Sequence, residues 1–166
     1  GAADPQVAAR LAQLPVDPRL GKALLDFGPA AAPTVALLSL GETGNIALRR
    51  PDQREVQRLQ RLAGPSTSRR VAPGEVIGHA FPHLVARRVA DGEYLLAQGT
   101  RAVVPAEFGL MGEEWLAVAD VRLERSGRAR VQAAAPIAES AALDVIGVSE
   151  KTECVFEDGR VRATRV

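Results

Sequence analysis

The sequence has little of several residue types, and each shortage narrows what the chain can be. Its 166 residues include a single cysteine, Cys154, which excludes an internal disulfide framework and fits a reducing cytoplasm. No apolar run approaches the roughly 18 residues that a membrane-spanning helix requires. The first residues, GAADPQ, show neither the basic nor the apolar region of a secretory signal. We therefore expect a cytoplasmic protein with no membrane contact.

Catalytic motifs are missing as well. The phosphate-binding pattern G-x-x-x-x-G-K-[ST] does not occur, and the only Gly-Lys pair, Gly21 and Lys22, falls inside a predicted helix. His79 and His83 have the spacing of a helical metal pair, but Pro82 between them interrupts the helix that would align them. Cys154 has no histidine nearby that could serve as its base. We expect no catalytic residue, no metal and no cofactor in this chain.

Positive charge gathers in the middle of a nearly neutral chain. The formal net charge is +1, and all but two of the 21 basic residues are arginine, a bias that a GC-rich genome explains as well as phosphate binding does. Residues 49–70 contain seven arginines and two acids, whereas residues 71–166 contain eleven basic and fourteen acidic residues. A uniformly basic nucleic-acid-binding protein is therefore excluded, but a local basic surface is not.

The first part of the chain, residues 1–65, predicts a small helical bundle. Asp4 with Pro5, and Asp17 with Pro18, each combine a helix-capping residue with a proline suited to the first helical turn. Pro15 and Gly28 end these two helices, and a third runs from Pro33 to Leu40 before a loop at residues 41–45.

A fourth predicted helix, from about Pro51 to Ala63, is amphipathic. Its apolar face carries Val56, Leu59 and Ala63. The opposite face carries Arg54, Arg58 and Arg61, which could follow a phosphate backbone or could simply form a solvated helix face. Residues 64–68, GPSTS, are the best candidate for a linker.

The second part, residues 66–147, predicts a small β-barrel with flanking helices at about 73–80 and 139–146. Asp91 and Gly92 form a hairpin turn. The cleanest strand places Trp115, Ala117, Ala119, Val121 and Leu123 on one face, and Trp115 and Tyr94 are expected in the core rather than on a stacking platform. Five short strands with a helix indicate a bent barrel of the OB type. The expected strands cover residues 83–89, 93–98, 100–104, 115–124 and 129–134.

The last part, residues 148–166, predicts a β-hairpin around the turn Asp158–Gly159. One of its sides carries Cys154, Phe156, Val161 and Ala163 and needs cover. A lone hairpin is marginally stable in water, so we expect it to pack on the barrel or to pair with a second copy as a dimer. The complete expectation is an α+β chain with an N-terminal small helical bundle, an OB-like five-stranded β-barrel and a C-terminal β-hairpin.

Several sequence motifs, taken in their order along the chain, resemble the region that follows the motor domains in bacterial DEAH-box RNA helicases of the HrpB type. LPVDPRLGKALL, at Leu14 to Leu25, and VALLSL, at Val35 to Leu40, are similar to the helical ratchet (HA2) segment of that family. GHAFPHLVARR, YLLAQG and EWLAVADV, which begin at Gly78, Tyr94 and Glu114, resemble its OB barrel. VFEDGRVRA, from Val155, resembles the start of its C-terminal extension, whereas Gln98 replaces the more common asparagine.

The resemblance implies a non-catalytic accessory fragment of an ATP-dependent RNA helicase. ATP, magnesium and nucleotide hydrolysis would then belong to motor domains of the same parent chain, which are the expected partners together with weakly bound single-stranded RNA. The alternative is a protein-interaction or regulatory platform without RNA contact; an independent enzyme has almost no support. The candidate RNA-binding residues are Arg54, Arg58, Arg61, Arg69, Arg70, Arg87, Arg88 and Arg101.

The missing phosphate loop leads to the first prediction. The purified chain will neither bind nor hydrolyse ATP, because it offers no loop for the phosphates and no magnesium ligands. Equilibrium binding of a fluorescent ATP analogue and an RNA-stimulated phosphate-release assay test this. ATPase activity that co-elutes with the chain through two orthogonal columns would contradict the accessory-fragment interpretation.

Overall fold

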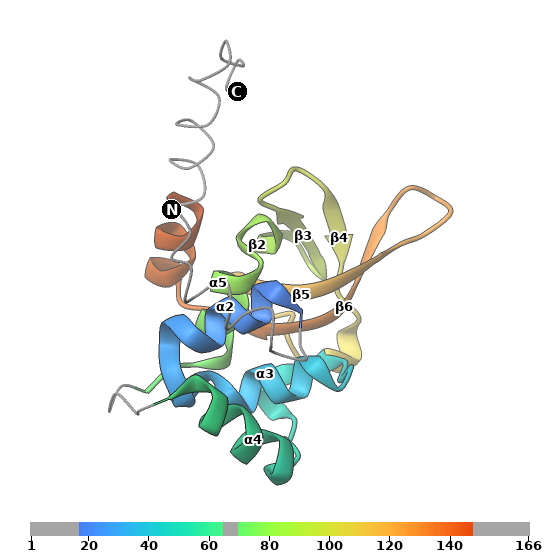
Figure 1. The fold of residues 1–166 in the computed structure, drawn as a ribbon. Coiled ribbons are helices and arrows are strands. Elements are labelled where there is room, and N and C mark those ends of the chain that lie inside the picture. Colours follow the sequence, from blue (N-terminus) through green and yellow to red (C-terminus); the bar gives the residue numbers. More distant parts are fainter. Residues whose placement is uncertain (1–16, 65–69, 148–166) are drawn as a thin grey trace.

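The computed structural model describes residues 17–64 and 70–147, in which a layer of helices lies against a closed β-barrel. Figure 1 shows α4 at one end of the molecule, α2 and α3 between, and the strands at the other end. The mixed fold class predicted from the sequence is confirmed. The C-terminal hairpin, the helix beginning near Asp4, and Arg69 lie outside the described residues.

The helical layer contains α2 (Pro18–Phe27), α3 (Ala32–Ser39) and α4 (Gln53–Ala63), with short 3₁₀ helices η1 (Gly28–Ala31) and η2 (Ile46–Leu48) between them. The predicted cap at Asp17 is confirmed, and Asp52 caps α4, which was not predicted from the sequence. The Asp17 side chain accepts a hydrogen bond from the Arg19 backbone N–H at 2.8 Å, and Asp52 accepts one from Arg54 at 2.9 Å. Each bond satisfies one of the free N–H groups at a helix start.

The barrel is built from β2 (Val85–Ala90), β3 (Glu93–Leu96), β4 (Arg101–Val103), β5 (Trp115–Leu123) and β6 (Ala129–Pro136). The strands are hydrogen-bonded in the order β6-β4-β3-β2-β5, and a β5–β6 pairing closes the ring. β4 and β6 run parallel, and the other barrel pairs are antiparallel. The predicted five-stranded barrel is thereby confirmed, with this pairing order belonging to the OB type.

Two details differ from the sequence-based expectation. The loop expected at residues 41–45 contains a sixth short strand, β1 (Gly44–Asn45), which pairs in parallel with Ala133 and Ala134 of β6. In β5 the expected apolar face is interrupted, because the register with β6 shifts twice between Val118 and Val121. The two shifts cancel, because Val121 pairs with Val131 in the same register in which Val118 pairs with Ala134. Leu123, which the alternation had placed on the apolar face, is nevertheless 71% exposed at the end of the strand.

Small residues let the helices approach the barrel. α5 (Pro73–Ala80) and the 3₁₀ helix η3 (Pro82–Leu84) precede β2, and α5 packs on β5 and β6. Gly74 lies directly over β6: a Cβ atom there would be 2.0 Å from the carbonyl oxygen of Pro136. The buried residues of the helical layer and the barrel form one continuous core, with Tyr94 as its largest fully buried side chain.

A polar contact joins α2 to α5 at the surface. Nε2 of His79 lies 2.8 Å from Oδ2 of Asp26, which also accepts a hydrogen bond from Lys22, and the His79 ring meets Phe27 edge-on at 5.0 Å. Burial raises the pKa of Asp26, but the hydrogen bonds from Lys22 and His79 outweigh it and leave the pKa below its usual value. His79 therefore faces α2.

The close approach at Gly74 leads to the second prediction. Gly74→Ala should lower the free energy of unfolding by about 2 kcal/mol, because the added methyl group must push α5 away from the β6 backbone. Helix propensity alone would favour alanine at this position, so the sign of the effect identifies the contact. Gly112→Ala is the matched control, since a Cβ atom at Gly112 meets nothing within 4 Å. Urea unfolding followed by Trp115 fluorescence measures both; equal stability of the two variants would contradict the packing argument.

Candidate nucleic-acid interface

A row of side chains crosses the outside of the barrel. Arg87 of β2 lies opposite Trp115 of β5 and Leu95 of β3, and Leu95 lies opposite Arg101 of β4. Directly opposed residues of neighbouring strands share a face of the sheet. The next row, Leu116, Ala86 and Leu96, is buried, so the first row points outward. We call Trp115, Arg87, Leu95 and Arg101 the first outer row.

Trp115 gives this row an aromatic surface. The side chain is partly buried against the core, and the Arg87 guanidinium lies 5.9 Å from the centre of its ring, within the range of a cation–π contact. Leu95, which lies on the other side of Arg87, is 41% exposed. Trp115 was predicted to be a core residue; it is packed against the core only on one side and borders the surface on the other. Tyr94, also predicted in the core, is completely buried.

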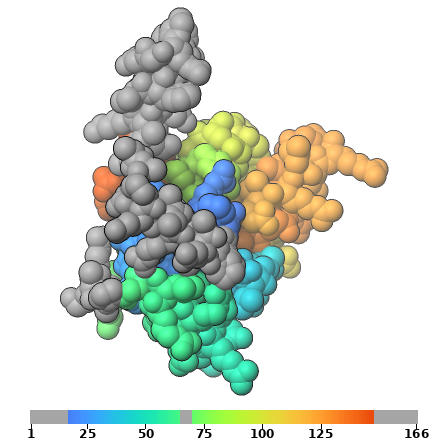
Figure 2. Space-filling model, viewed as in Figure 1, coloured from blue at the N-terminus to red at the C-terminus, as the bar shows by residue number. Residues whose placement is uncertain are grey.

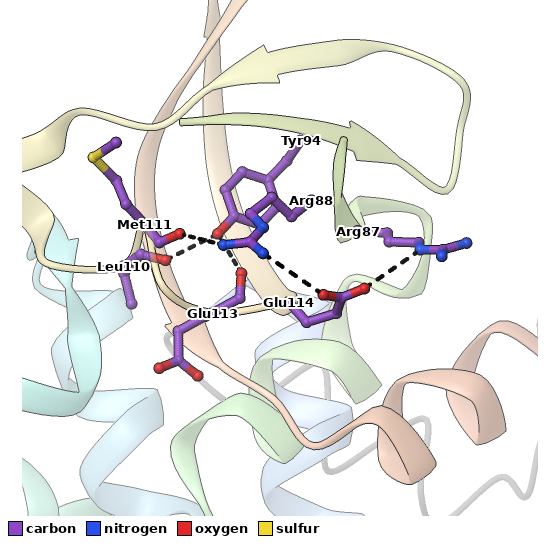
Figure 3. A network of polar contacts seen from close by, with 7 residues as sticks. All are labelled: Arg87, Arg88, Tyr94, Leu110, Met111, Glu113 and Glu114. Atoms are coloured by element: carbon purple, nitrogen blue, oxygen red, sulfur yellow. Dashed lines mark hydrogen bonds and ion pairs between the residues drawn. The ribbon is translucent and has the colours of Figure 1, made fainter. Parts of the chain in front are cut away.

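Arg88 has a different role from its neighbour Arg87, because consecutive residues of a strand point to opposite faces. Figure 3 shows Arg88 turned towards the loop before β5, where its guanidinium donates a hydrogen bond to the Met111 carbonyl at 3.1 Å. Glu114 lies between the two arginines, 3.9 Å from Arg87 Nε and 4.0 Å from Arg88 Nη2. Arg88 therefore stabilises this loop, and Arg87 is the more available of the two cations.

The Tyr94 hydroxyl supports the same loop from inside the barrel. It lies 2.9 Å from the carbonyl oxygen of Leu110 and 2.5 Å from that of Glu113, and it donates its proton to this pair of acceptors (Figure 3). Burial raises the pKa of Tyr94, with Glu113 and Glu114 adding to the shift and the Arg88 charge opposing it. The phenol thus stays protonated at neutral pH and remains a donor.

A second outer row lies next to the first and was missed in the sequence. Val103 of β4 is opposite Glu93 and Arg130, and Arg130 is opposite Arg122 of β5. Glu93 and Val103 each lie two residues from a member of the first row and hence on the same outward face. Arg122 and Arg130 are like charges in direct opposition, an arrangement that costs stability without an anion between them. Only the strand register could reveal this pair, because eight residues separate them in the chain.

The second outer row continues into the β5–β6 hairpin. Figure 2 shows this hairpin, in orange, projecting as an arm from the body of the molecule. Arg125 and Arg128 lie near its tip, and Arg128 is 3.9 Å from Glu93. Arginines of β2, β4 and the hairpin thus lie on one continuous outer surface of the barrel, and Arg87 and Arg101 were the predicted members.

The predicted arginines of α4 belong to another surface. Val56, Leu59 and Ala63 are buried as expected, and Arg54 and Arg61 are exposed. Arg58 is held by an ion pair with Glu55, which reduces its availability for phosphate. α4 packs on α3 and η1, at the end of the molecule away from the strands (Figure 1). Arg70, exposed just before α5, is likewise not part of the barrel surface.

Other kinds of site find no support among residues 17–64 and 70–147. This part of the chain contains no group of three His, Cys, Asp or Glu side chains that could hold a metal ion. None of its helices is long and apolar enough to cross a membrane. His83 is partly buried beside Arg19, and burial followed by the Arg19 charge lowers its pKa, so it is neutral at pH 7.

Comparisons with known proteins identify the fold. No protein-family model and no curated protein matched the chain. Among solved structures, it is similar to the Escherichia coli DExH-box NTPase HrpB, with a TM-score of 0.67 and 24% identity over 89% of this chain and 20% of that one. A second structure, of the E. coli DEAH/RHA helicase HrpB, gives a TM-score of 0.68 and 21% identity over 80% and 19%. The chain thus spans about a fifth of the HrpB chains, and the predicted resemblance is confirmed in fold.

The unequal roles of two adjacent arginines lead to the third prediction. Arg88→Met should lower the free energy of unfolding by about 1 kcal/mol, because the Met111 carbonyl loses a charged donor at a partly exposed site. Arg87→Met is the matched control and should change it by less than about 0.5 kcal/mol. Urea denaturation measures both variants. Equal destabilisation would show that the contact of Arg88 with the loop contributes nothing.

Proposed function

We propose that this chain is a non-catalytic accessory part of an ATP-dependent RNA helicase, and that its barrel holds single-stranded RNA beside the motor domains. The likeness in fold to one fifth of HrpB supports the placement within a larger helicase. The motor domains would supply ATP binding, magnesium and hydrolysis. The observation that carries the RNA-binding proposal is the first outer row, which combines arginines with an aromatic surface.

The arrangement of the outer rows suits a single strand. Arg87 and Arg101 flank Leu95 on neighbouring strands, so two phosphates of one strand can be neutralised while a base lies on the apolar surface between them. Trp115 offers a ring face for stacking at the end of the row. The Arg122–Arg130 pair continues the cationic surface towards the hairpin. Contacts of this kind neutralise phosphates and release counterions without reading sequence.

A second candidate function, a platform for a protein partner, rests on a different surface. A hollow of about 250 Å³ lies between the helical layer and the barrel, with Leu20, Leu38 and Phe81 in its lining. Asp17, Glu42 and Asp120 also line it. Carboxylates repel phosphate, so this surface suits a basic side chain of a protein and not RNA. The two functions use separate surfaces and can be tested separately.

The fourth prediction tests the outer row by salt dependence. Arg87→Gln combined with Arg101→Gln should weaken binding to a single-stranded oligouridylate and reduce the slope of log K against log salt by about 1.4, since each phosphate contact contributes about 0.7. Arg54→Gln combined with Arg61→Gln removes the same charge from α4 and should leave the slope unchanged. Fluorescence anisotropy of labelled RNA between low and moderate salt gives both slopes.

The outcomes separate the two candidate functions. If the α4 variant alone loses the salt dependence, RNA follows the helix and the outer row is excluded. If the folded wild-type chain does not bind RNA at low salt, the protein-platform function becomes the better explanation. Quenching of Trp115, the single tryptophan of the chain, on RNA addition would place a base at the first outer row.

A further inference from the structure

A second hollow, of about 390 Å³, lies where the helical layer meets the end of β4. Its lining includes Thr43, Asn45, Leu48, Arg49, Glu107 and Phe108. Glu107 and Phe108 belong to the 3₁₀ helix η4 (Ala106–Phe108), and the other four belong to the segment around β1 and η2. Two segments about sixty residues apart in the chain thus form its walls.

Asn45 holds the two walls together. The residue is only 9% exposed, its Nδ2 donates to the Phe108 carbonyl at 3.3 Å, and its Oδ1 accepts from the Ala47 N–H at 3.1 Å. Both ends of the amide are therefore engaged within the protein, and Asn45 keeps the hollow open instead of contacting a ligand. The parallel pairing of Asn45 with Ala134 anchors this wall to the barrel.

Arg49 is held in place against the backbone. Its Nε donates to the Thr43 carbonyl at 2.9 Å, and its guanidinium covers Gly44, where a Cβ atom would lie 2.4 Å from Nη2. Gly44 also has a positive φ of 86°, so both its conformation and its neighbour favour glycine. The terminal nitrogens of the guanidinium remain as donors, and within the described ranges Arg49 forms no ion pair.

The rest of the hollow supplies an acceptor and an apolar surface. Glu107 is exposed and, among the residues described, forms no ion pair with Arg49 or any other cation. Leu48 is 76% exposed, and Phe108 is partly buried. Hydrogen-bond donors, an acidic acceptor, an aliphatic and an aromatic side chain thus line one cavity, a combination that suits a small planar ligand with polar edges.

We propose that this hollow is a pocket for a single guanine base of the bound strand. Arginine pairs with the O6 and N7 acceptors of guanine, and a carboxylate can accept from its N1–H and N2–H donors. Guanine is the base that has two neighbouring acceptors on one edge and two neighbouring donors on another. Leu48 and Phe108 would contact the faces of the ring, as apolar and aromatic side chains do for unstacked bases of single-stranded RNA.

This inference rests on the proposed RNA-binding function. It extends that function from sequence-independent binding of the RNA to a preference for one base. The hollow follows the second outer row along β4, because the chain runs from Val103, a member of that row, through two residues into η4, whose Glu107 and Phe108 line the hollow. A strand that lies along the outer rows can therefore reach the pocket with its next nucleotides. The outer rows would hold any sequence, and the pocket would favour strands with a guanine at the right place.

The test compares a decauridylate with the same oligomer carrying one guanine, using the full chain. The guanine oligomer should bind about tenfold more tightly, the lower range for one well-made bidentate contact. Glu107→Gln should remove this preference and leave decauridylate binding unchanged. Glu113→Gln is the matched control on the loop before β5, and it should keep the preference. Replacing guanosine by inosine, which lacks the N2 amine, should reduce the preference in wild type and in Glu113→Gln, but not in Glu107→Gln.

A second measurement distinguishes failure of the proposed guanine pocket from failure of the proposed RNA binding at the outer rows. Guanosine monophosphate, but not uridine monophosphate, should shift the NMR resonances of the Asn45 side chain and the Phe108 amide. Equal affinity for the two oligomers, without these shifts, overturns the guanine-pocket proposal and leaves the proposal of RNA binding at the outer rows unaffected. If neither oligomer binds but the shifts occur, the proposal of RNA binding at the outer rows is overturned and the guanine-pocket proposal is retained. Retention of the preference in Glu107→Gln overturns the assigned role of Glu107.

Discussion

The structure depends on close packing around β6, because several other elements contact this strand. This strand pairs with β5 and β4 to close the barrel, and with β1 to attach the helical layer. Its residues Ala133, Ala134 and Ala135 are all buried, and Gly74 of α5 lies on its last residue, Pro136. Larger side chains at these positions would separate the layers, because a close-packed interior cannot absorb the added volume. The scarcity of aromatics in the chain is consistent with this construction from small residues.

Closure of the barrel determines which surfaces are free to bind. The helical layer and α5 cover β5 and β6 on one side, which is why Ala117 and Val118 are both buried in β5. Among residues 17–64 and 70–147, the helices pack elsewhere, and the outward faces of β2, β3 and β4 carry Arg87, Leu95 and Arg101. The exposed cationic surface is therefore a consequence of the side on which the helices pack, and not of the overall charge.

Hydrogen bonds divide the arginines into structural and available groups. Arg88 and Arg49 each donate to a backbone carbonyl and hold a loop in place, and Arg58 is paired with Glu55. Arg87 has a cation–π contact with Trp115 and a distant contact with Glu114, and Arg122 faces Arg130 directly. Uncompensated like charge on an exposed sheet is stabilised by an anion, whereas a compensated arginine gains little from one. This distinction makes the outer rows a better candidate than α4 for the proposed RNA contact, although α4 has the more regular arginine spacing.

The sequence by itself determined the types and bounds of most elements, because caps, prolines and turns act over a few residues. Asp17 with Pro18 begins α2, and the Asp91–Gly92 turn connects β2 to β3, where the sequence predicts them. Tertiary structure alone decided the pairing of Gly44 with Ala133, the register shifts within β5, and which of Arg87 and Arg88 contacts the loop before β5. These features depend on contacts between segments far apart in the chain, and a shift of one residue in register exchanges the two faces of a strand. The candidate site, the outer rows and the hollow at Arg49 are assembled from such contacts, so local sequence could identify some of their members but not their arrangement.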